Sequence, residues 1–593
     1  MAKEKLSSFG QSEEGGVSRR DFLSGLALAG AGAAALGLTG CAPGPQTIDK
    51  QANISVVEKM PGTGEYVGQT YSTIPVVNTK NPTIGPIVEA VPANSPWAMP
   101  EYIDTPDEVL EAQLVCVGAG LGGMSAALTA LQNGLSNVIV VERSDDVGGQ
   151  SAQAEGITGI DTKWQHDLGY KSEDINVDAM LQKEFDWHHY ICNATLWRAV
   201  FSRNGADLQW LIDTCGPDTI VGCGGGRYGS VPTHHFYKHN RGREMTIALA
   251  DSIRSAGGEI MLNTRAIHML MDDGKVAGIQ CLTSDGKCIN IMTPAVVLAT
   301  AGAGANKDLI ERWSERNTDN QYWHGIPTVT GDGIMLAVEA GMGKPFRFGG
   351  PGFAAGVEPL MLESHFCIAA AMESRGIWLN QDGERFYNEA NNKLVYPPVN
   401  AIESQDRTFV IFDQDAMDYY KTKGVVNGWA QYAYPGELLT SAEEECEAEI
   451  AKGNPYVFKS DSLEEMLEAM QLPVEQGMAS IEHYNQLVDN GEDTEYFKPA
   501  DYLNAVRQPP FYGARLKALI ISQKGGIHCN NKGQVTTRQG KAIPGLYVAG
   551  MDCGGFQSQT TGITIPGSVQ GYALGMGRIC GENTAAYVQG LTA

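Results

Sequence analysis

Short apolar runs that alternate with glycine-rich turns organise the middle and the end of this 593-residue chain. Leu114–Val117 and Val138–Val141 have the length of buried β-strands, and the interval between them fits one α-helix. Residues 262–266 form another short run, and residues 295–302 and 544–550 are apolar runs that each end in a glycine turn. This pattern predicts an α/β fold that contains a βαβ unit.

Three glycines, Gly118, Gly120 and Gly123, follow the first apolar run directly. The first permits a tight turn, the second lets the backbone approach a pyrophosphate, and the third lets the next helix pack closely. Glu142 closes the second run, 19 residues after Gly123, where a carboxylate can accept a hydrogen bond from a ribose hydroxyl. Alone, the glycines also fit a turn without a ligand. With strand, helix, second strand and terminal acid in order, they predict a dinucleotide site.

A second glycine pair follows this βαβ unit. Gly148 and Gly149 stand beside the amide of Gln150 and the hydroxyl of Ser151. Backbone N–H groups in such a segment can cradle a pyrophosphate and a ribityl chain. A nicotinamide dinucleotide does not call for this second cradle.

Together these segments resemble the FAD-binding domain of the fumarate reductase and flavocytochrome c superfamily, over about residues 111–345 and 510–590. The members that this chain resembles include ketosteroid dehydrogenases and ene-reductases. The resemblance does not extend to the haem domain that some members carry. It implies an α/β protein with non-covalent FAD on a Rossmann-like domain of the GR2 type and an inserted α+β capping domain. The residues that it assigns to FAD are Gly118, Ala119, Gly120, Gly122, Gly123, Glu142, Arg143, Gly148, Gly149, Gln150, Ser151, Ala266, Ala301, Gly302, Gly550, Asp552, Ser568 and Val569.

The C-terminal part of this assignment departs from the family in one place. Residues 565–568 resemble the closing motif, in which a helix N-terminus points at the N1/O2 edge of the flavin. Ser568 also fits the plainer role of an N-cap. The family's acidic residue after Ala-Gly is replaced by Met551, and Asp552 follows one place later. Whether Asp552 reaches the ribityl hydroxyls stays open at this point.

The resemblance divides the chain into five segments. They are a signal (1–41), an extended tether or strap (42–110), the first part of the FAD-binding domain (111–345), a capping domain for the substrate (346–509) and the second part of the FAD-binding domain (510–593). In the cap, the capping box at residues 462–465 predicts the start of one amphipathic helix, and residues 481–485 lie late in a second. A cap fits the chemistry, because hydride transfer requires a site from which water is excluded.

The first 41 residues predict export. Residues 18–23, SRRDFL, precede an Ala/Gly-rich run to Leu38 and resemble a bacterial twin-arginine signal. Residues 38–41 resemble a lipobox, which predicts a lipid anchor at Cys41 on the outer face of the cytoplasmic membrane; in an ordinary signal peptide Cys41 would be incidental. The run is short for a stable membrane span.

Charge and cysteine spacing exclude several function classes. Lys and Arg number 43 against 69 Asp and Glu, and the net charge of -26 argues against nucleic acid as a partner. The 12 cysteines include no CxxC pair, so the sequence predicts no zinc site or iron–sulfur cluster. The sequence also lacks CxxCH, the motif that attaches haem and that haem-bearing relatives carry in an attached cytochrome domain. Electrons are therefore expected from a separate membrane or multihaem cytochrome donor.

Three substrate residues of the fumarate-type proteins are missing. Phe353 stands where the family's first histidine would be, and Ser522 where the second would be. The final loop, residues 557–564, contains no arginine. A dicarboxylate would lose its charge-assisted bidentate contacts at such a site, so the sequence predicts a larger and less charged substrate.

Residues 373–389 resemble the run that leads to the family's catalytic arginine. Counting on from Glu389 places Lys393 at the position of this arginine, which acts as the proton donor in the family. Lysine can donate a proton if desolvation and cationic neighbours lower its pKa, so we expect a relay of Glu373, Arg375 and Lys393. Tyr387 and Tyr396 are nearby substitutes. In the alternative, Lys393 is a solvated surface lysine and the cap arginines make structural ion pairs.

The histidines His234, His235 and His239 flank Tyr237 and have no family counterpart. We expect these histidines to form a polar rim and not to bind a metal ion, so the sequence predicts no metal. The sequence thus predicts an exported, membrane-associated FAD-dependent reductase of activated C=C bonds in a small unsaturated organic substrate. One alternative is a ketosteroid-type desaturase. An alternative of another class is a flavin electron-transfer lipoprotein without substrate chemistry.

Overall fold

The computed structural model describes residues 98–592, except 225–230, 315–316, 346–347, 349–351, 395–396, 429–432, 434, 523–524 and 558–564. The predicted signal, Cys41, most of the tether, Tyr396 and nearly all of the final loop lie outside the described residues. In the part of the chain that is described, no helix is both long enough and apolar enough to cross a membrane.

A six-stranded sheet forms the centre of the nucleotide-binding domain, in the order β18-β19-β11-β2-β3-β7. Neighbouring strands in this sheet are parallel, except that β18 is antiparallel to β19. Every residue of β2 and β3 is buried, as is typical of parallel strands covered on both faces. The strands are β2 (Leu114–Val117), β3 (Val138–Val141), β7 (Glu259–Met261), β11 (Val296–Leu298), β18 (Gln534–Thr536) and β19 (Ala542–Val548).

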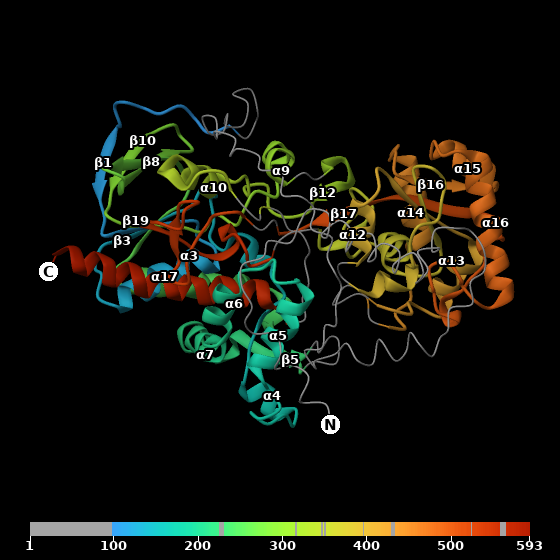
Figure 1. Cartoon of the computed structure of the whole chain (residues 1–593), viewed down its shortest axis with the longest axis horizontal. Helices are drawn as coiled ribbons and strands as arrows, with labels where there is room; N and C mark the ends of the chain where they lie inside the picture. Colours follow the sequence, from blue (N-terminus) through green and yellow to red (C-terminus); the bar gives the residue numbers. More distant parts are fainter. Residues whose placement is uncertain are drawn as a thin grey trace, which may run out of the picture. The chain divides into compact units, whose positions relative to one another are not determined.

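Helices cover one face of this sheet and a four-stranded sheet covers the other (Figure 1). The helices are α3 (Leu121–Gln132), α8 (Arg243–Ser255) and α17 (Ser568–Thr592). The second sheet consists of β1 (Glu108–Glu111), β8 (Thr264–Asp272), β9 (Lys275–Thr283) and β10 (Cys288–Met292). The strand expected at residues 262–266 therefore begins at Thr264, in this second sheet.

Two glycines let α17 lie directly against α3. A Cβ atom on Gly577 would stand 2.4 Å from the carbonyl oxygen of Gly122, and one on Gly581 would stand 2.5 Å from that of Ala126. Such distances are far below van der Waals contact, so any larger residue would push the helices apart. This packing fixes the N-terminal end of α17, which begins at Ser568.

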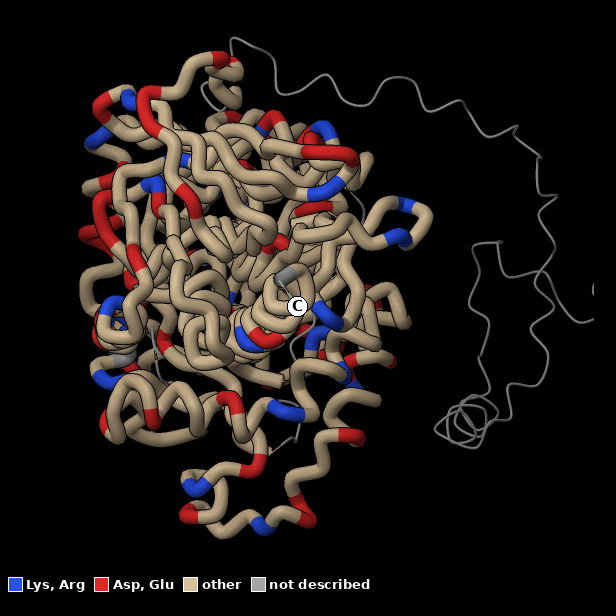
Figure 2. Tube along the Cα trace, turned by 90° about the vertical axis from the view of Figure 1, so that its left-hand side faces the viewer, with Lys and Arg blue, Asp and Glu red and all other residues tan. Residues whose placement is uncertain are grey.

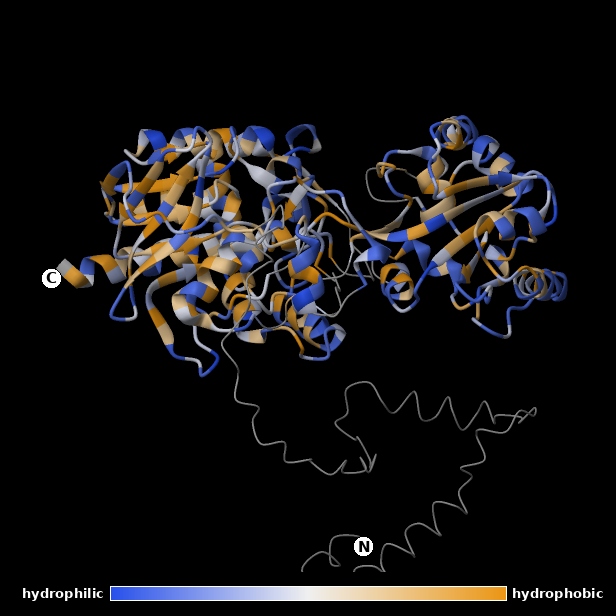
Figure 3. Ribbon diagram, turned by 90° about the horizontal axis from the view of Figure 1, so that it is seen from above, coloured by the Kyte–Doolittle hydropathy of each residue, from blue (hydrophilic) through white to orange (hydrophobic). Residues whose placement is uncertain are grey.

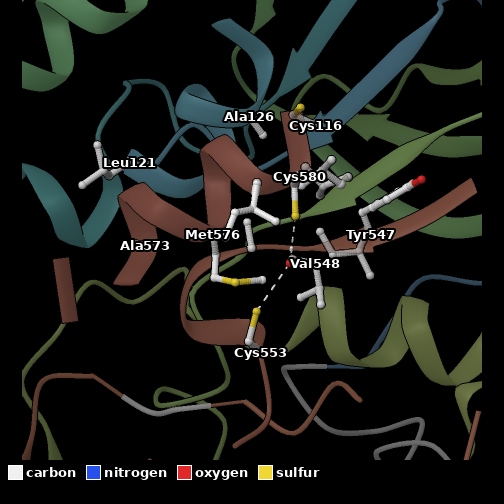
Figure 4. Packing of buried hydrophobic residues seen from close by; sticks show 14 of the residues in the cluster. Cys116, Leu121, Ala126, Tyr547, Val548, Cys553, Ala573, Met576 and Cys580 are labelled. Atoms are coloured by element: carbon white, nitrogen blue, oxygen red, sulfur yellow. Dashed lines mark hydrogen bonds between the residues drawn. The ribbon is translucent and has the colours of Figure 1, made fainter. Parts of the chain in front are cut away.

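The core continues from the sheet into α17 around Val548 (Figure 4). Its carbonyl oxygen accepts weak hydrogen bonds from the thiols of Cys553 and Cys580, at 3.4 and 3.2 Å. Met576 and Leu121 pack in the same cluster. The eleven described cysteines are free thiols.

A three-stranded antiparallel sheet with helices is inserted between β3 and α8, in the order β4-β6-β5. Its elements are β4 (Gly156–Thr158), β5 (Ile220–Gly224), β6 (His234–Tyr237), α4 (Lys163–Asp167), α5 (Val177–Trp187), α6 (Ala194–Phe201) and α7 (Asn204–Cys215). The short helices α9 (Lys307–Ser314) and α10 (Asp332–Ala337) follow β11.

The cap is built on a sheet in the order β12-β17-β15-β14, and β13 and β16 also pair with β17. Its strands are β12 (Gln321–Trp323), β13 (Ala354–Gly356), β14 (Ile377–Asn380), β15 (Thr408–Phe412), β16 (Val457–Ser460) and β17 (Phe511–Ile520). Its helices are α11 (His365–Cys367), α12 (Pro397–Glu403), α13 (Gln414–Thr422), α14 (Ala442–Ala451), α15 (Leu463–Ala469) and α16 (Val474–Asn490). Single turns complete the chain: η1 (Gly149–Gln153), η2 (Pro217–Thr219), η3 (Lys238–Asn240), η4 (Thr318–Asn320), η5 (Val338–Met342), η6 (Ile368–Met372), η7 (Glu389–Lys393), η8 (Ala500–Tyr502) and η9 (Gly550–Asp552).

Both predicted cap helices are present. The hydroxyl of Ser462 accepts from the backbone N–H of Glu465 at 3.3 Å and so caps α15, and residues 481–485 lie in the second half of α16. Apolar residues concentrate on the strands and on the inner faces of the helices (Figure 3). Acidic residues are spread over many surface loops and helices in the view of Figure 2, with basic residues between them. The net negative charge is therefore not confined to one element.

The chain passes between the two domains along neighbouring strands. β12 and β17 are parallel neighbours, with Gln321 opposite Ala518 and Trp323 opposite Ile520, so both lead the chain from the cap sheet towards the nucleotide-binding domain. The chain enters the cap again through β13, which is antiparallel to β17 with Ala354 opposite Leu519. The two crossings that follow β12 and β17 thus lie side by side, although almost the whole cap separates them in sequence.

Candidate functional site

A cavity of about 600 Å³ extends from the first βαβ turn to residues of the cap. Gly118, Gly120 and Glu142 line it at the nucleotide-binding end, and Phe353 and Leu362 line it at the cap. One continuous space can therefore hold a cofactor and a substrate together.

The three glycines of the βαβ turn take the roles that their spacing predicts. Gly118 has a φ of 106°, and a Cβ atom there would stand 2.4 Å from the carbonyl oxygen of Ala299. A Cβ atom on Gly123 would stand 2.0 Å from the carbonyl oxygen of Gly118. At Gly120 the nearest atom to such a Cβ is the carbonyl oxygen of Gly148, 3.9 Å away, so a Cβ there would cause no clash and would lie beside the cavity. Gly118 and Gly123 shape the turn, and Gly120 leaves room for a phosphate.

Glu142 is buried at the end of β3 and lines the cavity. Its carboxylate accepts hydrogen bonds from the backbone N–H of Ala119 at 2.9 Å and of Ser144 at 2.8 Å. A carboxylate has about four acceptor positions, so acceptor capacity remains for a ribose hydroxyl. The two backbone bonds hold the carboxylate in place for that contact.

Two arginines share one carboxylate beside this end of the cavity. Asp332 accepts from the Nε and Nη2 of Arg265 at 2.8 and 2.9 Å, and from Nη1 of Arg143 at 3.2 Å. Burial lowers the pKa of Arg143, and the charge of Asp332 offsets part of that effect. All three line the cavity. Asp332 and Arg265 were missed from the sequence; the position of Arg265, directly before Ala266, is the signal that could have identified it.

At the start of α17, two buried polar atoms have no partner among the described residues. They are the Oγ of Ser568 and the Oε1 of Gln570, and both residues line the cavity. Ser568 is the first helical residue and not the residue before it, so the expected N-cap bond is not made. Unpaired buried polar atoms at a helix N-terminus call for a polar ligand. The polar edge of a flavin fits this requirement, and the glycine turn fits a pyrophosphate. The residues present therefore fit FAD.

Most of the predicted FAD residues meet in this cavity. Those that line it are Gly118, Gly120, Gly122, Glu142, Arg143, Gly149, Gln150, Ser151, Ala266, Ala301, Gly550, Ser568 and Val569. The other five do not line it: Ala119, Gly123, Gly148, Gly302 and Asp552.

Asp552 holds the turn after β11. Its carboxylate accepts from the backbone N–H groups of Thr300 and Gly302, the latter at 2.8 Å, and from the Thr300 hydroxyl at 2.9 Å. Burial raises the pKa of Asp552 to about 6, against the opposing effect of these hydrogen bonds. Met551 lines the cavity in its place. The structure thus places Asp552 where it orders backbone and not in the lining of the cavity.

The three residues of the expected proton relay do not line the cavity. Glu373 is buried and accepts from the backbone N–H groups of residues 426–428 at 2.9, 3.0 and 3.2 Å. Burial raises its pKa to about 7, although these bonds and the charge of Arg375 favour the ionised form. The Arg375 guanidinium lies 3.4 Å from the centre of the Tyr419 ring. Lys393 is exposed, with its Nζ 5.2 Å from the centre of the Tyr502 ring.

The tyrosine proposed as a substitute donor is also away from the cavity. Tyr387 is buried and stacks on Trp378, with ring centres 4.7 Å apart. Arg385, in the same segment, makes a buried ion-pair network with Glu389 and Asp493 at 2.9 and 2.8 Å. For Arg385 this is the structural role that the sequence left open.

The three histidines of the insertion separate. His234 lines the cavity. His235 is buried, with Nδ1 2.9 Å from the carbonyl oxygen of Thr233 and Nε2 2.6 Å from the hydroxyl of Thr162, and burial lowers its pKa to about 4. His239 is exposed and pairs with Glu244 at 3.0 Å. No group of three metal-ligating side chains occurs among the described residues.

Gln150 connects the nucleotide-binding domain to both crossings. Its Oε1 accepts from the backbone N–H of Ile326 at 2.7 Å, and its Nε2 donates to the carbonyl oxygen of Ile521. Ile326 follows β12 and Ile521 follows β17. Because Gln150 also lines the cavity, one side chain links the expected cofactor position to the place where the cap is attached.

Comparisons with known proteins agree with this site. The family model described as FAD binding domain matches residues 113–562. The chain is 33% identical over 491 residues to the vinyl phenol reductase of Lactiplantibacillus plantarum, which covers 80% of this chain and 96% of that protein. It is 26% identical to the NADH:acrylate oxidoreductase of Vibrio harveyi, over 80% of this chain and 50% of that protein.

The fold has a counterpart among solved structures. The open conformation of a flavocytochrome c3 fumarate reductase superposes with a TM-score of 0.59, at 23% identity, over 82% of this chain and 79% of that one. At this level of identity the similarity concerns the fold alone.

Proposed function

Because this chain belongs to the FAD binding domain family and is an FAD-dependent oxidoreductase acting on carbon–carbon bonds, we propose that it reduces an activated C=C bond in a small uncharged or weakly charged substrate. The resemblance expected from the glycine turns is thereby confirmed, as are the fold class and the cofactor. The observation that carries the proposal is the continuous cavity, in which the FAD residues and residues of the cap share one space.

When bound and reduced by an electron donor, FAD would supply a hydride for the carbon–carbon double bond. Glu142, the glycine turn and the start of α17 would hold the cofactor, and the cap wall with Phe353 and Leu362 would keep water from the substrate. Vinyl phenol and acrylate, named for the two relatives, both carry a double bond in conjugation. Their names support alkene reduction over the reverse reaction.

The proton for the second carbon requires a donor in the cavity. Among the described residues, His234 and His324 line it and are of the type that transfers protons near neutral pH. The relay of Glu373, Arg375 and Lys393 remains the competing proposal. If Lys393→Met keeps the wild-type rate of substrate reduction, Lys393 is not the donor; loss of about a hundredfold, the usual contribution of general acid catalysis, would support the relay.

We also propose export by the twin-arginine route, lipid attachment at Cys41 and electron supply from a separate membrane or multihaem cytochrome. The support is the SRRDFL motif, the lipobox-like residues 38–41 and the absence of CxxCH from the sequence. Metabolic labelling with a fatty acid, compared between the wild type and Cys41→Ala, tests the anchor. Label that persists in the variant would contradict it.

The reaction is tested with purified protein that retains its flavin. After anaerobic reduction by a dye, we expect conjugated alkenes to reoxidise the flavin and to be recovered as the saturated compounds. Bleaching of the oxidised protein by saturated ketones would instead identify a desaturase. If neither class of compound changes the flavin spectrum, the protein transfers electrons without substrate chemistry.

A further inference from the structure

The cap side of the cavity differs in chemistry from the nucleotide side. From the cap and its second crossing, the described lining residues include Phe353, Met361, Leu362 and Ser522. The charged side chain among the described residues of this wall is Glu363; none of them is Lys or Arg. Arg241 also lines the cavity, but it is exposed and belongs to the nucleotide-binding domain. A substrate that approaches the cap wall therefore meets apolar side chains, the polar side chains of Ser522 and His324, and one carboxylate.

His324 stands with Glu363 at this wall. It directly follows β12, and its backbone N–H donates to the carbonyl oxygen of Ile520 at 2.8 Å, which fixes its position at the crossing. Burial lowers the pKa of the half-buried His324 imidazole, and the negative charge of Glu363 offsets that effect only in part. The ring nitrogens of this imidazole can donate to or accept from a hydroxyl group of a substrate.

Glu363 lies on the segment between β13 and α11 and is exposed at the mouth of the cavity. Met361, two residues earlier, is 54% exposed and lines the same mouth. A negative group at an entrance raises the energy of every anion that enters. The effect is moderate at an exposed position, because water and salt screen it.

We propose that Glu363 is a specificity-determining residue that rejects substrates carrying a carboxylate beside the double bond and so selects uncharged alkenes. His324 then serves uncharged substrates as a hydroxyl partner. The inference rests on the proposed function, since it concerns the substrate of that same cavity. It assigns the selection to one side chain of the cap and not to the missing histidines and arginine alone.

The test measures binding of saturated compounds, which the enzyme cannot reduce. Calorimetry on the flavin-loaded protein compares 4-ethylphenol with 3-(4-hydroxyphenyl)propanoate, which carries an added carboxylate. We expect the wild type to bind the uncharged compound about tenfold more tightly, and Glu363→Gln to reduce this preference about three- to tenfold, as expected for one screened charge. Glu363→Lys should reverse it. Glu384→Gln removes an exposed carboxylate of the cap outside the cavity lining and should leave the preference unchanged.

Equal affinities in the wild type, no binding of either compound, or a preference that survives in both Glu363 variants would overturn the inference. Its failure is separable from failure of the proposed function. If the preference behaves as expected but no alkene reoxidises the flavin, the inference stands and alkene reduction falls. If alkenes are reduced while the preference is absent or insensitive to Glu363, the reverse holds. Flavin content and thermal midpoint confirm that each variant is folded.

Discussion

A methyl group added at Gly120 or at Gly123 meets opposite surroundings. At Gly120 it would clash with no protein atom and would lie beside the cavity, whereas at Gly123 it would collide with the carbonyl oxygen of Gly118. We expect Gly120→Ala to keep its free energy of unfolding but to lose flavin, because the methyl occupies the place left for a phosphate. Gly123→Ala should lose about 3 kcal/mol through overpacking. Urea unfolding and flavin content, measured on both variants, separate the two effects; equal behaviour would contradict the assignment.

Glu373 makes the stability of the cap depend on pH. Burial raises the pKa of Glu373 to about 7, from an ordinary value of 4.5, so the folded chain holds this proton more tightly than the unfolded chain. Its contribution to stability is fully present below pH 4.5 and is lost as the pH rises through 7. Between pH 5 and pH 8 this amounts to about 2 kcal/mol.

The measurement is the free energy of unfolding at pH 5 and at pH 8. Glu373→Gln should lose less stability over this interval than the wild type, by about 2 kcal/mol. Glu384→Gln, which removes an exposed carboxylate of the cap, serves as the control and should follow the wild type. Parallel pH profiles for Glu373→Gln and the wild type would show that the Glu373 proton is not involved.

Some of these residue roles could be read from the sequence and others could not. The glycines and Glu142 act through backbone geometry next to one strand, so their spacing was sufficient. The relay of Glu373, Arg375 and Lys393 is close in sequence, yet the Glu373 carboxylate turns to the backbone of residues 426–428. Only tertiary structure decides where such a side chain turns.

The packing of α17 on α3 sets the end of the helix that faces the cavity. Gly577→Leu would drive a side chain into the backbone of α3, and we expect the start of α17 to shift and flavin to be lost. Gly590→Ala in the last turn of the same helix is the control, since nothing lies within 4 Å of the added atom. It should be neutral or stabilise by up to about 1 kcal/mol, because alanine favours helix. Flavin content and thermal unfolding check both variants.

The strands that were predicted correctly are the ones buried on both faces. β2, β3, β11 and β19 appear as apolar runs because parallel strands covered by helices and by a second sheet carry no polar face. The pairing of β12 with β17 has no such local signal, since the two strands are distant in sequence. His324 and Glu363 come to line one cavity only in the tertiary structure, which is why neither was identified beforehand.

For the molecule as a whole, Gln150 is the side chain that ties the nucleotide-binding domain to both crossings. Gln150→Leu would remove its hydrogen bonds with the backbone of Ile326 and Ile521. We expect proteolysis at these two segments to become about tenfold faster, in line with the loss of a typical pair of hydrogen bonds. Gln182→Leu, on the exposed face of α5, should cleave at the wild-type rate. Identical rates for Gln150→Leu and the wild type would mean that other contacts hold the crossings.

The antiparallel pairing of β13 with β17 also bears on how such a protein can diversify. Because the polypeptide departs through β13 and returns through the adjacent β17, the intervening segment behaves as a cassette: a recombination event needs only two breakpoints, in neighbouring strands, to exchange it. The residues that bind the coenzyme would be inherited unchanged, while the range of accepted substrates would change in a single step.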